Sequence, residues 1–199
     1  AGMAGRACAN MGLGGLRLVT PELWEAEHQE KALSLATSQG EPLVREAACF
    51  ASLREAVADC HFVLGTTART GGWRRRVLSP ATAGVKIAAR LTEGAQAALV
   101  FGPEDRGLLN EEIELCTAIA CIPTASGAAS LNLAQAVLIL AYECFKAVEA
   151  ARFAEVEAAV APERPEGEYS AEMLPIPHHI THSVQEMLLA AMSQVLTDV

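Results

Sequence analysis

The sequence predicts an α/β fold with a mostly parallel β-sheet that helices cover on both faces. Three observations predict it. Short apolar runs alternate with helical patterns, turn residues separate them, and 51% of the 199 residues are hydrophobic. Strands that are buried on both faces read as continuous apolar runs, which is the pattern here. A chain of this length can bury one sizeable core without disulfides or a metal.

Strands and helices alternate over the first 123 residues. The expected strands are apolar runs bounded by turn residues, and the segments between them carry apolar residues at helical spacing. A helix between two strands is the usual crossover of a parallel pair, so the alternation indicates a parallel sheet. In chain order, the expected strands span 16–19, 61–66, 97–102 and 118–123, and the expected helices span 28–36, 52–59, 81–91 and 110–116.

A long helix is expected from about 131 to 160, because apolar residues recur there at helical spacing. It is long enough to cross the domain and emerge, so residues 1–160 are expected to form one domain. The Pro- and Glu-containing stretch 161–179 is interpreted as a linker. A last amphipathic helix is expected over 183–196, since Ser183 and Glu186 form the pattern of a capping box. Residues 161–199 are thus expected to be a linker and a C-terminal helical extension.

The stretch LVFGPEDRGLLNEE, residues 99–112, is a candidate ligand loop. It leads from an apolar strand into a glycine, a carboxylate and a second glycine, and then returns to a helical pattern. Glycines at the end of a buried strand let the backbone approach a ligand closely. An ordinary strand-to-helix turn explains the same residues, so this stretch alone leaves both interpretations open.

Charge is distributed unevenly along the chain. The net charge of −9 argues mildly against a nucleic-acid partner, because lysine and arginine supply most of the affinity for phosphate. Acidic residues concentrate at 22–30, 104–114 and 155–172. The segment ARTGGWRRR nevertheless forms a candidate basic patch, with a solvated loop as the alternative; its arginines are Arg69, Arg74, Arg75 and Arg76.

Two tempting motifs predict no site. GLGGLR, at 12–17, resembles part of a dinucleotide fingerprint, but a strand follows its glycines and Arg17 replaces the third glycine, so we interpret it as a turn. In HHITH, His178 and His182 could chelate a metal on one helix, but the expected cap at Ser183 leaves His182 outside it. We therefore expect no metal site.

The cysteines and the hydropathy of the sequence indicate in which cellular compartment the protein is expected. The six cysteines show no C-x-x-C pair and mostly lie in apolar runs, which favours buried thiols over zinc ligands or disulfides. No apolar run reaches the roughly 18 residues of a membrane span. The start of the chain shows no signal-peptide pattern. We expect a cytoplasmic protein that has no membrane partner.

Three ordered motifs carry a resemblance to a known family. AGMAGRACANMGLGGLRLV resembles motif 1 of the SPOUT RNA methyltransferases, in the TrmH/SpoU branch that methylates ribose 2′-hydroxyls. FGPEDRGL, then IP, then SLNLAQAV resemble motifs 2 and 3 of the same branch. GTTART, at 65–70, is similar to the cofactor-side loop of the TrmJ group, which modifies the tRNA anticodon loop. The resemblance covers about Gly2 to Ala150.

The resemblance implies a trefoil-knotted α/β (SPOUT) domain with a pocket for S-adenosylmethionine. In this fold the C-terminal part is threaded through a loop to form the pocket, an exception to the rule against knots. By family analogy, backbone groups and small residues from several loops hold the cofactor. The expected cofactor-binding residues are Thr66, Ala68, Gly102, Gly107, Ile122 and Leu131.

The same resemblance implies the reacting residues. Arg6 matches the reactive-site arginine, Glu104 is the motif 2 carboxylate, and Ser130 and Asn132 are the motif 3 polar pair near the reacting ribose. Methyl transfer from a sulfonium needs an oxygen nucleophile in line with the carbon–sulfur bond, so positioning and help with the hydroxyl proton should supply most of the rate. Because an arginine pKa lies above about 12, we expect Arg6 to hold an RNA phosphate and orient the hydroxyl. The group that takes the proton is left open.

The chain departs from the family at its start. The family's motif 1 usually begins with an asparagine after a β-strand, directly before the segment that matches AGMAGRA, and this chain starts at Ala1. Either preceding residues are missing from the chain or the first strand has been lost. The first alternative is favoured, because a parallel sheet tolerates no central gap.

The leading function is an S-adenosylmethionine-dependent RNA ribose 2′-O-methyltransferase acting on tRNA. The alternatives are a knotted RNA- or cofactor-binding protein without turnover, an rRNA 2′-O-methyltransferase and a small-molecule methyltransferase; Arg6 and the basic segment count against the last. The sequence does not name the target nucleotide, because RNA is recognised by shape and scattered side chains. A homodimer is expected, since family enzymes pair through knot-region helices and the helix at 131–150 is apolar over more than one narrow stripe.

Overall fold

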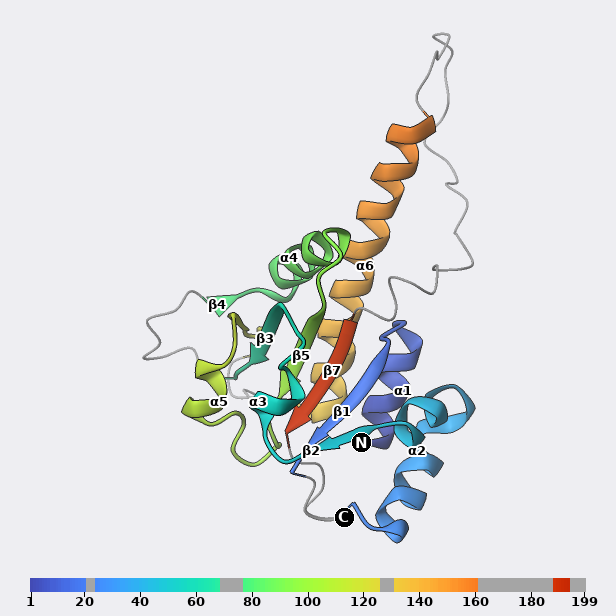
Figure 1. Ribbon diagram of the computed structural model, residues 1–199, viewed down its shortest axis with the longest axis vertical. Helices are drawn as coiled ribbons and strands as arrows, with labels where there is room; N and C mark the ends of the chain where they lie inside the picture. The colour runs from blue at the N-terminus through green and yellow to red at the C-terminus, as the bar shows by residue number, and fades with distance from the viewer. Residues whose placement is uncertain (21–23, 69–76, 126–130, 161–187, 194–199) are drawn as a thin grey trace.

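The computed structural model describes residues 1–20, 24–68, 77–125, 131–160 and 188–193, which form one parallel sheet with helices on both faces. The strands described are β1 (Gly15–Val19), β2 (Ala48–Phe50), β3 (Phe62–Thr66), β4 (Val77–Leu78), β5 (Ala97–Phe101), β6 (Ala118–Ala120) and β7 (Leu188–Ser193). The helices described are α1 (Gly2–Asn10), α2 (Ala26–Arg45), α3 (Leu53–Ala56), α4 (Pro80–Thr92), α5 (Asn110–Glu114) and α6 (Leu133–Val160). The strand order is β2-β1-β7-β5-β3-β6-β4, and every neighbouring pair is parallel (Figure 1). The predicted α/β class is confirmed.

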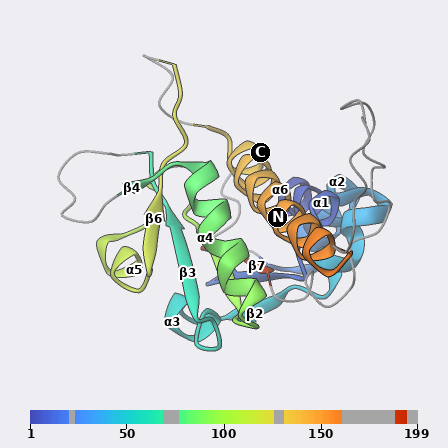
Figure 2. The same ribbon diagram turned by 90° about the horizontal axis from the view of Figure 1, so that it is seen from above.

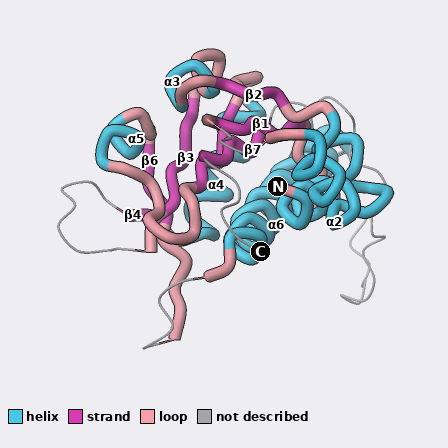
Figure 3. The backbone as a smooth tube through the Cα atoms, turned by 90° about the horizontal axis from the view of Figure 1, so that it is seen from below, coloured by secondary structure: helices cyan, strands magenta, loops and turns pink. Residues whose placement is uncertain are grey.

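Helices of different size cover the two faces of the sheet. The longer helices α1, α2, α4 and α6 pack on one face, and the short α3 and α5 pack on the other (Figures 2 and 3). Successive strand residues alternate between the two cores: Leu64 and Leu99 belong to the first core, and Val63 and Val100 to the second. All four side chains are buried. This double burial explains why the strands are continuous apolar runs in the sequence.

The predicted alternation of elements agrees with the structure over most of the chain. The four predicted strands are β1, β3, β5 and a shorter β6, and the predicted helices are α2 to α6. The turn predicted at GLGGLR is confirmed over its first half, where Gly12 has a φ of 67°, and β1 begins at Gly15 within the motif. Helix α1 and the short strands β2 and β4 were not predicted from the sequence. α6 extends beyond the sheet, as expected from its length (Figure 1).

The helix predicted over 183–196 is wrong at Leu188–Ser193, where the chain forms β7. β7 lies between β1 and β5, with Ala190 opposite Leu16 on one side and Leu99 on the other. The run LLAAMS is apolar up to its last residue, and periodicity cannot distinguish a strand buried on both faces from a helix segment. The sheet is therefore unbroken from β2 to β4, with β7 in its interior. The knot, which depends on how the chain is threaded, stays a prediction.

Arg17, at the end of the GLGGLR turn, has a structural role. Its guanidinium binds the Asp59 carboxylate through two parallel bonds, Nη1 to Oδ1 at 2.5 Å and Nη2 to Oδ2 at 2.7 Å. It also donates to the Ala56 carbonyl oxygen at 2.6 Å. The hydrogen bond from Arg17 lowers the pKa of Asp59 to about 2. These contacts tie β1 to the end of α3, which accounts for an arginine at this position.

The cysteines were expected to be buried thiols, and the structure confirms this for three of the six. All six are described, and none forms a disulfide. Cys8, Cys116 and Cys144 are buried, and burial raises the pKa of Cys8 and Cys144 to about 12. Such thiols stay protonated and pack as small apolar groups. Cys49, on β2, is instead exposed.

Candidate functional site

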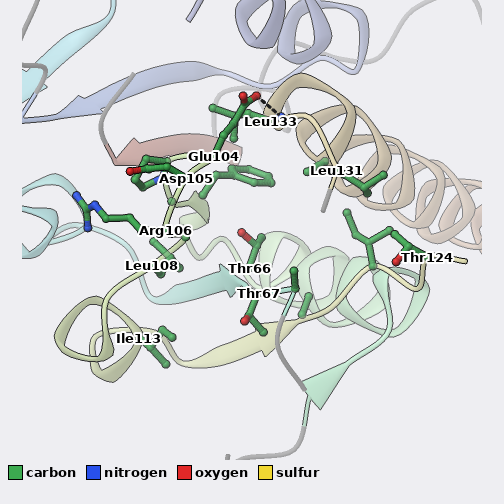
Figure 4. Close-up of a pocket in the computed structure, with 18 of the residues that line it drawn as sticks. Thr66, Thr67, Glu104, Asp105, Arg106, Leu108, Ile113, Thr124, Leu131 and Leu133 are labelled. Atoms are coloured by element: carbon green, nitrogen blue, oxygen red, sulfur yellow. Dashed lines mark hydrogen bonds between the residues drawn. The ribbon is translucent and has the colours of Figure 1, made fainter. Parts of the chain in front are cut away.

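A cavity of ≈ 380 Å³ opens where β3, β5 and β6 end. Because neighbouring parallel strands point the same way, their carboxyl ends meet at one edge, which is where α/β sheets commonly bind ligands. The loops after these strands and the start of α6 complete the walls (Figure 4). Its volume lies within the range of about 300–1,000 Å³ that is typical of small-molecule sites.

The cavity brings together all the residues expected to bind the cofactor. They come from three loops and the segment before α6, separated by many residues in the sequence. Their shared position agrees with a common ligand, although their role in binding stays a prediction. The residues concerned are Thr66, Ala68, Gly102, Gly107, Ile122 and Leu131.

The loop after β5 is a tight turn that also forms a wall of the cavity. A Cβ added to Gly102 would lie 2.2 Å from the carbonyl carbon of Gly107 and 2.3 Å from the amide nitrogen of Leu108. Gly107 has open space around it but a φ of 71°, and its N–H donates to the Pro103 oxygen at 2.8 Å. Gly102 is therefore required for space and Gly107 for conformation. The loop after β5 is thus a strand-to-helix turn that also lines the cavity, and its binding of a ligand stays a prediction.

Glu104 joins this loop to the start of α6. Its Oε1 accepts a hydrogen bond from the Leu133 N–H at 2.7 Å (Figure 4). The same oxygen accepts from Asn132 Nδ2 at 2.9 Å. Asn132 also caps α6, because its Oδ1 accepts from the Ala134 N–H at 3.0 Å and its own N–H donates to Gln135 Oε1 at 3.2 Å. A carboxylate is stabilised at a helix N-terminus by the unpaired amides and the helix dipole. Two predicted catalytic residues thus hold two walls of the cavity together.

The remaining predicted site residues are either described outside the cavity lining or not described at all. Arg6 is on α1 with an exposed side chain, and it is not among the residues that line the cavity. α1 packs against α2 and α6. Ser130 lies outside the described residues, and so do the predicted RNA contacts Arg69, Arg74, Arg75 and Arg76.

Sequence reasoning missed nearly two thirds of the residues that line the cavity, 12 of the 19. Several of the missed residues directly follow or end a predicted strand, so their position at a strand's carboxyl end was a usable signal. Those on α5 and α6 had no such signal, because their contribution depends on how the helices pack. The missed residues are Thr67, Phe101, Pro103, Asp105, Arg106, Leu108, Asn110, Ile113, Ala120, Thr124, Leu133 and Ala136.

The described parts of the chain contain neither a candidate membrane span nor a candidate metal cluster. No described helix combines the length and the apolar character that crossing a membrane requires. Among the residues with described positions, no group of three or more His, Cys, Asp or Glu side chains could hold a metal ion. His178 and His182 lie outside those residues.

Comparison with known proteins identifies the family. The family described as SpoU rRNA Methylase family matches residues 1–142. The tRNA (cytidine/uridine-2'-O-)-methyltransferase TrmJ of Yersinia pestis (strain Pestoides F) is 42% identical over 142 residues, which are 71% of this chain and 53% of that protein. The chain thus spans about half the length of this relative.

Solved structures agree with this match. TrmJ from Z. mobilis ZM4 aligns with a TM-score of 0.65 and 34% identity, covering 82% of this chain and 66% of that one. A structure described as giving insights into the 2-OH methylation of C/U34 on tRNA aligns with a TM-score of 0.54 and 25% identity, covering 75% of this chain and 88% of that one. Because the family match spans most of the sequence and includes both sides of the cavity, this chain belongs to the SpoU methylase family.

Proposed function

We propose that this chain is an S-adenosylmethionine-dependent methyltransferase domain that methylates a ribose 2′-hydroxyl of tRNA. The observation that carries the proposal is the cavity at the ends of β3, β5 and β6, where Glu104 of one motif binds Asn132 of the next. Membership of the SpoU methylase family supports the reaction. The name of the Yersinia relative, a tRNA (cytidine/uridine-2'-O-)-methyltransferase, supports the substrate.

The chemistry of the cavity fits S-adenosylmethionine. Phe101, Ile122 and Leu131 offer an apolar surface for a flat adenine, and Thr66 adds a hydroxyl. Gly102 and Gly107 bring backbone to the wall without side-chain bulk. With Ala68, these residues would hold the cofactor, which supplies a methyl group carried on a sulfonium.

The protein's own residues have the tasks of holding and orienting the RNA. Glu104 fixes Asn132 and the first turn of α6, so we assign both to the edge of the cavity where the ribose enters. Arg6 has the planar fork that binds two phosphate oxygens at once, and we assign it to the phosphate beside the target ribose. No residue is assigned to the hydroxyl proton. Positioning is the main contribution that this reaction requires.

We infer that the substrate is the anticodon loop of tRNA. One structural neighbour is described by the methylation of C/U34 on tRNA, and that position supports an anticodon-loop target. The basic segment with Arg69, Arg74, Arg75 and Arg76 is assigned to further RNA phosphates. We also propose a cytoplasmic location, which a tRNA substrate supports.

We further propose a homodimer that forms through α6. Leu138 and Tyr142 lie one helical turn apart on α6, and they are 41% and 48% exposed. Exposed apolar side chains on one helix face are typical of an interface. Sedimentation equilibrium at micromolar concentration should therefore give twice the chain mass of 20.9 kDa, and Leu138→Glu should shift the protein to monomer. A monomeric unmodified chain would contradict the proposal.

The proposed function is tested with two measurements on the unmodified chain. After treatment with a chelator, calorimetry should show binding of S-adenosylmethionine and of its demethylated product without added metal. Incubation with tRNA transcripts should then leave one gap in an alkaline hydrolysis ladder, because a 2′-O-methylated ribose lacks the hydroxyl that attacks its phosphate. Loss of binding after chelation would contradict the metal-free site. Binding of cofactor and tRNA without a gap on any transcript would favour a binding protein without turnover.

A matched pair of glycine variants tests the cofactor site. Gly107 and Gly94 both have a positive φ, 71° and 76°, and both have open space where a Cβ would lie, but only Gly107 lines the cavity. Substitution of either glycine by alanine should lower the free energy of unfolding by about 1–2 kcal/mol, because alanine is strained at a positive φ. Gly107→Ala should in addition raise the Kd for S-adenosylmethionine about tenfold or more, equal to about 1.4 kcal/mol, because the strained loop relaxes and moves the wall. Equal cofactor affinity in the two variants, measured by calorimetry, would count against the assigned site.

A further inference from the structure

α1 and α2 pack with their backbones in direct contact. A Cβ added to Gly2 would lie 2.1 Å from the Ala32 carbonyl oxygen, and one added to Gly5 would lie 2.4 Å from Val44 Cγ2. Real Cβ atoms do not approach other atoms this closely, so a side chain at either position requires a shift. The obstacle at Gly2 is the backbone of α2, and the obstacle at Gly5 is one methyl group of Val44. The path of α1 is therefore set by the surface of α2.

Gly40 of α2 lies directly against the backbone of Arg6. A Cβ at position 40 would be 2.7 Å from both the amide nitrogen and the Cα of Arg6, and 3.0 Å from the carbonyl carbon of Gly5. These are backbone atoms, which cannot rotate away as a side chain can. Glycine at position 40 thus allows Arg6 to occupy its observed place.

A kink in α2 brings two separate surfaces to α1. Thr37 interrupts the helix with a φ of 59° and a ψ of 176°, a conformation that L residues rarely adopt, and its Oγ1 donates to the Ala36 oxygen at 2.6 Å. The half of α2 before the kink carries Ala32, and the half after it carries Gly40; both contact α1 (Figure 1). Such strain costs about 1–3 kcal/mol and persists only where the surrounding structure enforces it.

We propose that the kinked α2 is a platform that positions Arg6, and that Gly40 is the positioning residue. This inference rests on the proposed function, in which Arg6 holds an RNA phosphate. The Arg6 side chain is exposed, so it is accessible to RNA. The backbone of Arg6 packs against Gly40 of α2, which fixes its position. When the backbone that carries a long side chain is already fixed, the side chain loses less conformational entropy on binding a phosphate.

The first test replaces the glycine under Arg6. Gly40→Ala should lower the rate of methyl transfer to tRNA by up to about 100-fold, because a displacement of about 1 Å can have that effect, and it should leave the Kd for S-adenosylmethionine unchanged. Gly84→Ala is the matched control, since its Cβ would lie 2.4 Å from the Glu143 oxygen in the contact between α4 and α6. It should lower stability comparably and keep most of the transfer rate.

The second test is a rescue. Apart from Val44 Cγ2 at 2.4 Å, the nearest atom to a Cβ at Gly5 is the Gly40 oxygen, at an ordinary 3.6 Å. Gly5→Ala alone should therefore displace α1 and slow transfer. Val44→Ala in the same chain removes the clashing methyl and should restore most of the rate, even though the double variant loses core packing. Because the same truncation also relieves steric strain, the rates are compared at a temperature where circular dichroism shows all three chains to be folded.

Three outcomes decide the inference. If the Gly40→Ala variant transfers methyl groups as fast as the Gly84→Ala variant, the inference is wrong. It is also wrong if the double variant Gly5→Ala, Val44→Ala is no faster than Gly5→Ala alone. The NMR resonance of Arg6 Nε–H, recorded in the full chain, should move in Gly40→Ala and stay in place in Gly84→Ala. If the unmodified chain methylates no tRNA, the proposed function is wrong, and the Arg6 resonance still decides whether α2 positions Arg6.

Discussion

The variant Ala190→Pro should lose much of the protein's stability to unfolding. Ala190 lies in β7 opposite Leu16 of β1 and Leu99 of β5, so its amide faces a neighbouring strand on whichever side it points. Proline removes that donor and leaves a buried acceptor unpaired, which costs at least about 1–3 kcal/mol before steric clashes are added. A whole domain is stable by only about 5–15 kcal/mol. Urea unfolding of the full chain, followed by circular dichroism, should show a much lower midpoint.

A proline at the edge of the same sheet is the matched control. The Thr20 N–H donates to the Phe50 oxygen at 2.8 Å, so Phe50 directs its backbone groups toward β1. Cys49, one residue earlier on the edge strand β2, directs its own groups away from β1. Cys49→Pro therefore removes no ladder bond and should shift the urea midpoint far less. Equal midpoints for the two variants would show that β7 does not contribute an interior strand.

The fold was predictable from the sequence where an element is determined by its own residues. β3 and β5 are apolar runs between turn residues, and both were predicted nearly to their ends. β7 was not predictable, because LLAAMS is compatible with a helix or a buried strand, and the neighbouring strands decide between them. α1 was missed for a related reason. Its glycines at positions 2 and 5 weaken a helix in isolation and are required by the contact with α2.

The candidate site was predictable to a similar extent. The glycines at 102 and 107 indicated a loop built for close approach, and the structure places both on the cavity wall. The bond between Glu104 and Asn132 joins residues 28 apart in the sequence, and no local pattern announces it. The capping of α6 by these two residues also could not be predicted, because Glu104 reaches the helix through the tertiary fold. Arg6 was identified by resemblance alone, and its relation to Gly40 emerged only from packing.

The variant Arg6→Lys should lower methyl transfer about 100-fold or more while leaving the affinity for S-adenosylmethionine unchanged. Lysine keeps the positive charge but lacks the planar fork that fixes two phosphate oxygens at once, so the ribose loses its orientation. Cofactor binding should persist, because Arg6 is not among the residues that line the cavity. Arg90→Lys is the control, since Arg90 is an exposed residue on α4 that pairs with Glu93. Its rate should match that of the unmodified chain.

The comparison of the two lysine variants separates orientation from charge. If Arg6 acted only through its charge, Arg6→Lys would methylate tRNA as fast as Arg90→Lys, and the assigned role would be wrong. If Arg6 orients the ribose, only Arg6→Lys should lose the protected position in the alkaline hydrolysis ladder, at cofactor concentrations that saturate both variants. The dependence of tRNA affinity on salt should change little in either variant, because each substitution keeps one positive charge. A steeply altered salt dependence with unimpaired transfer would instead place Arg6 away from the reacting ribose.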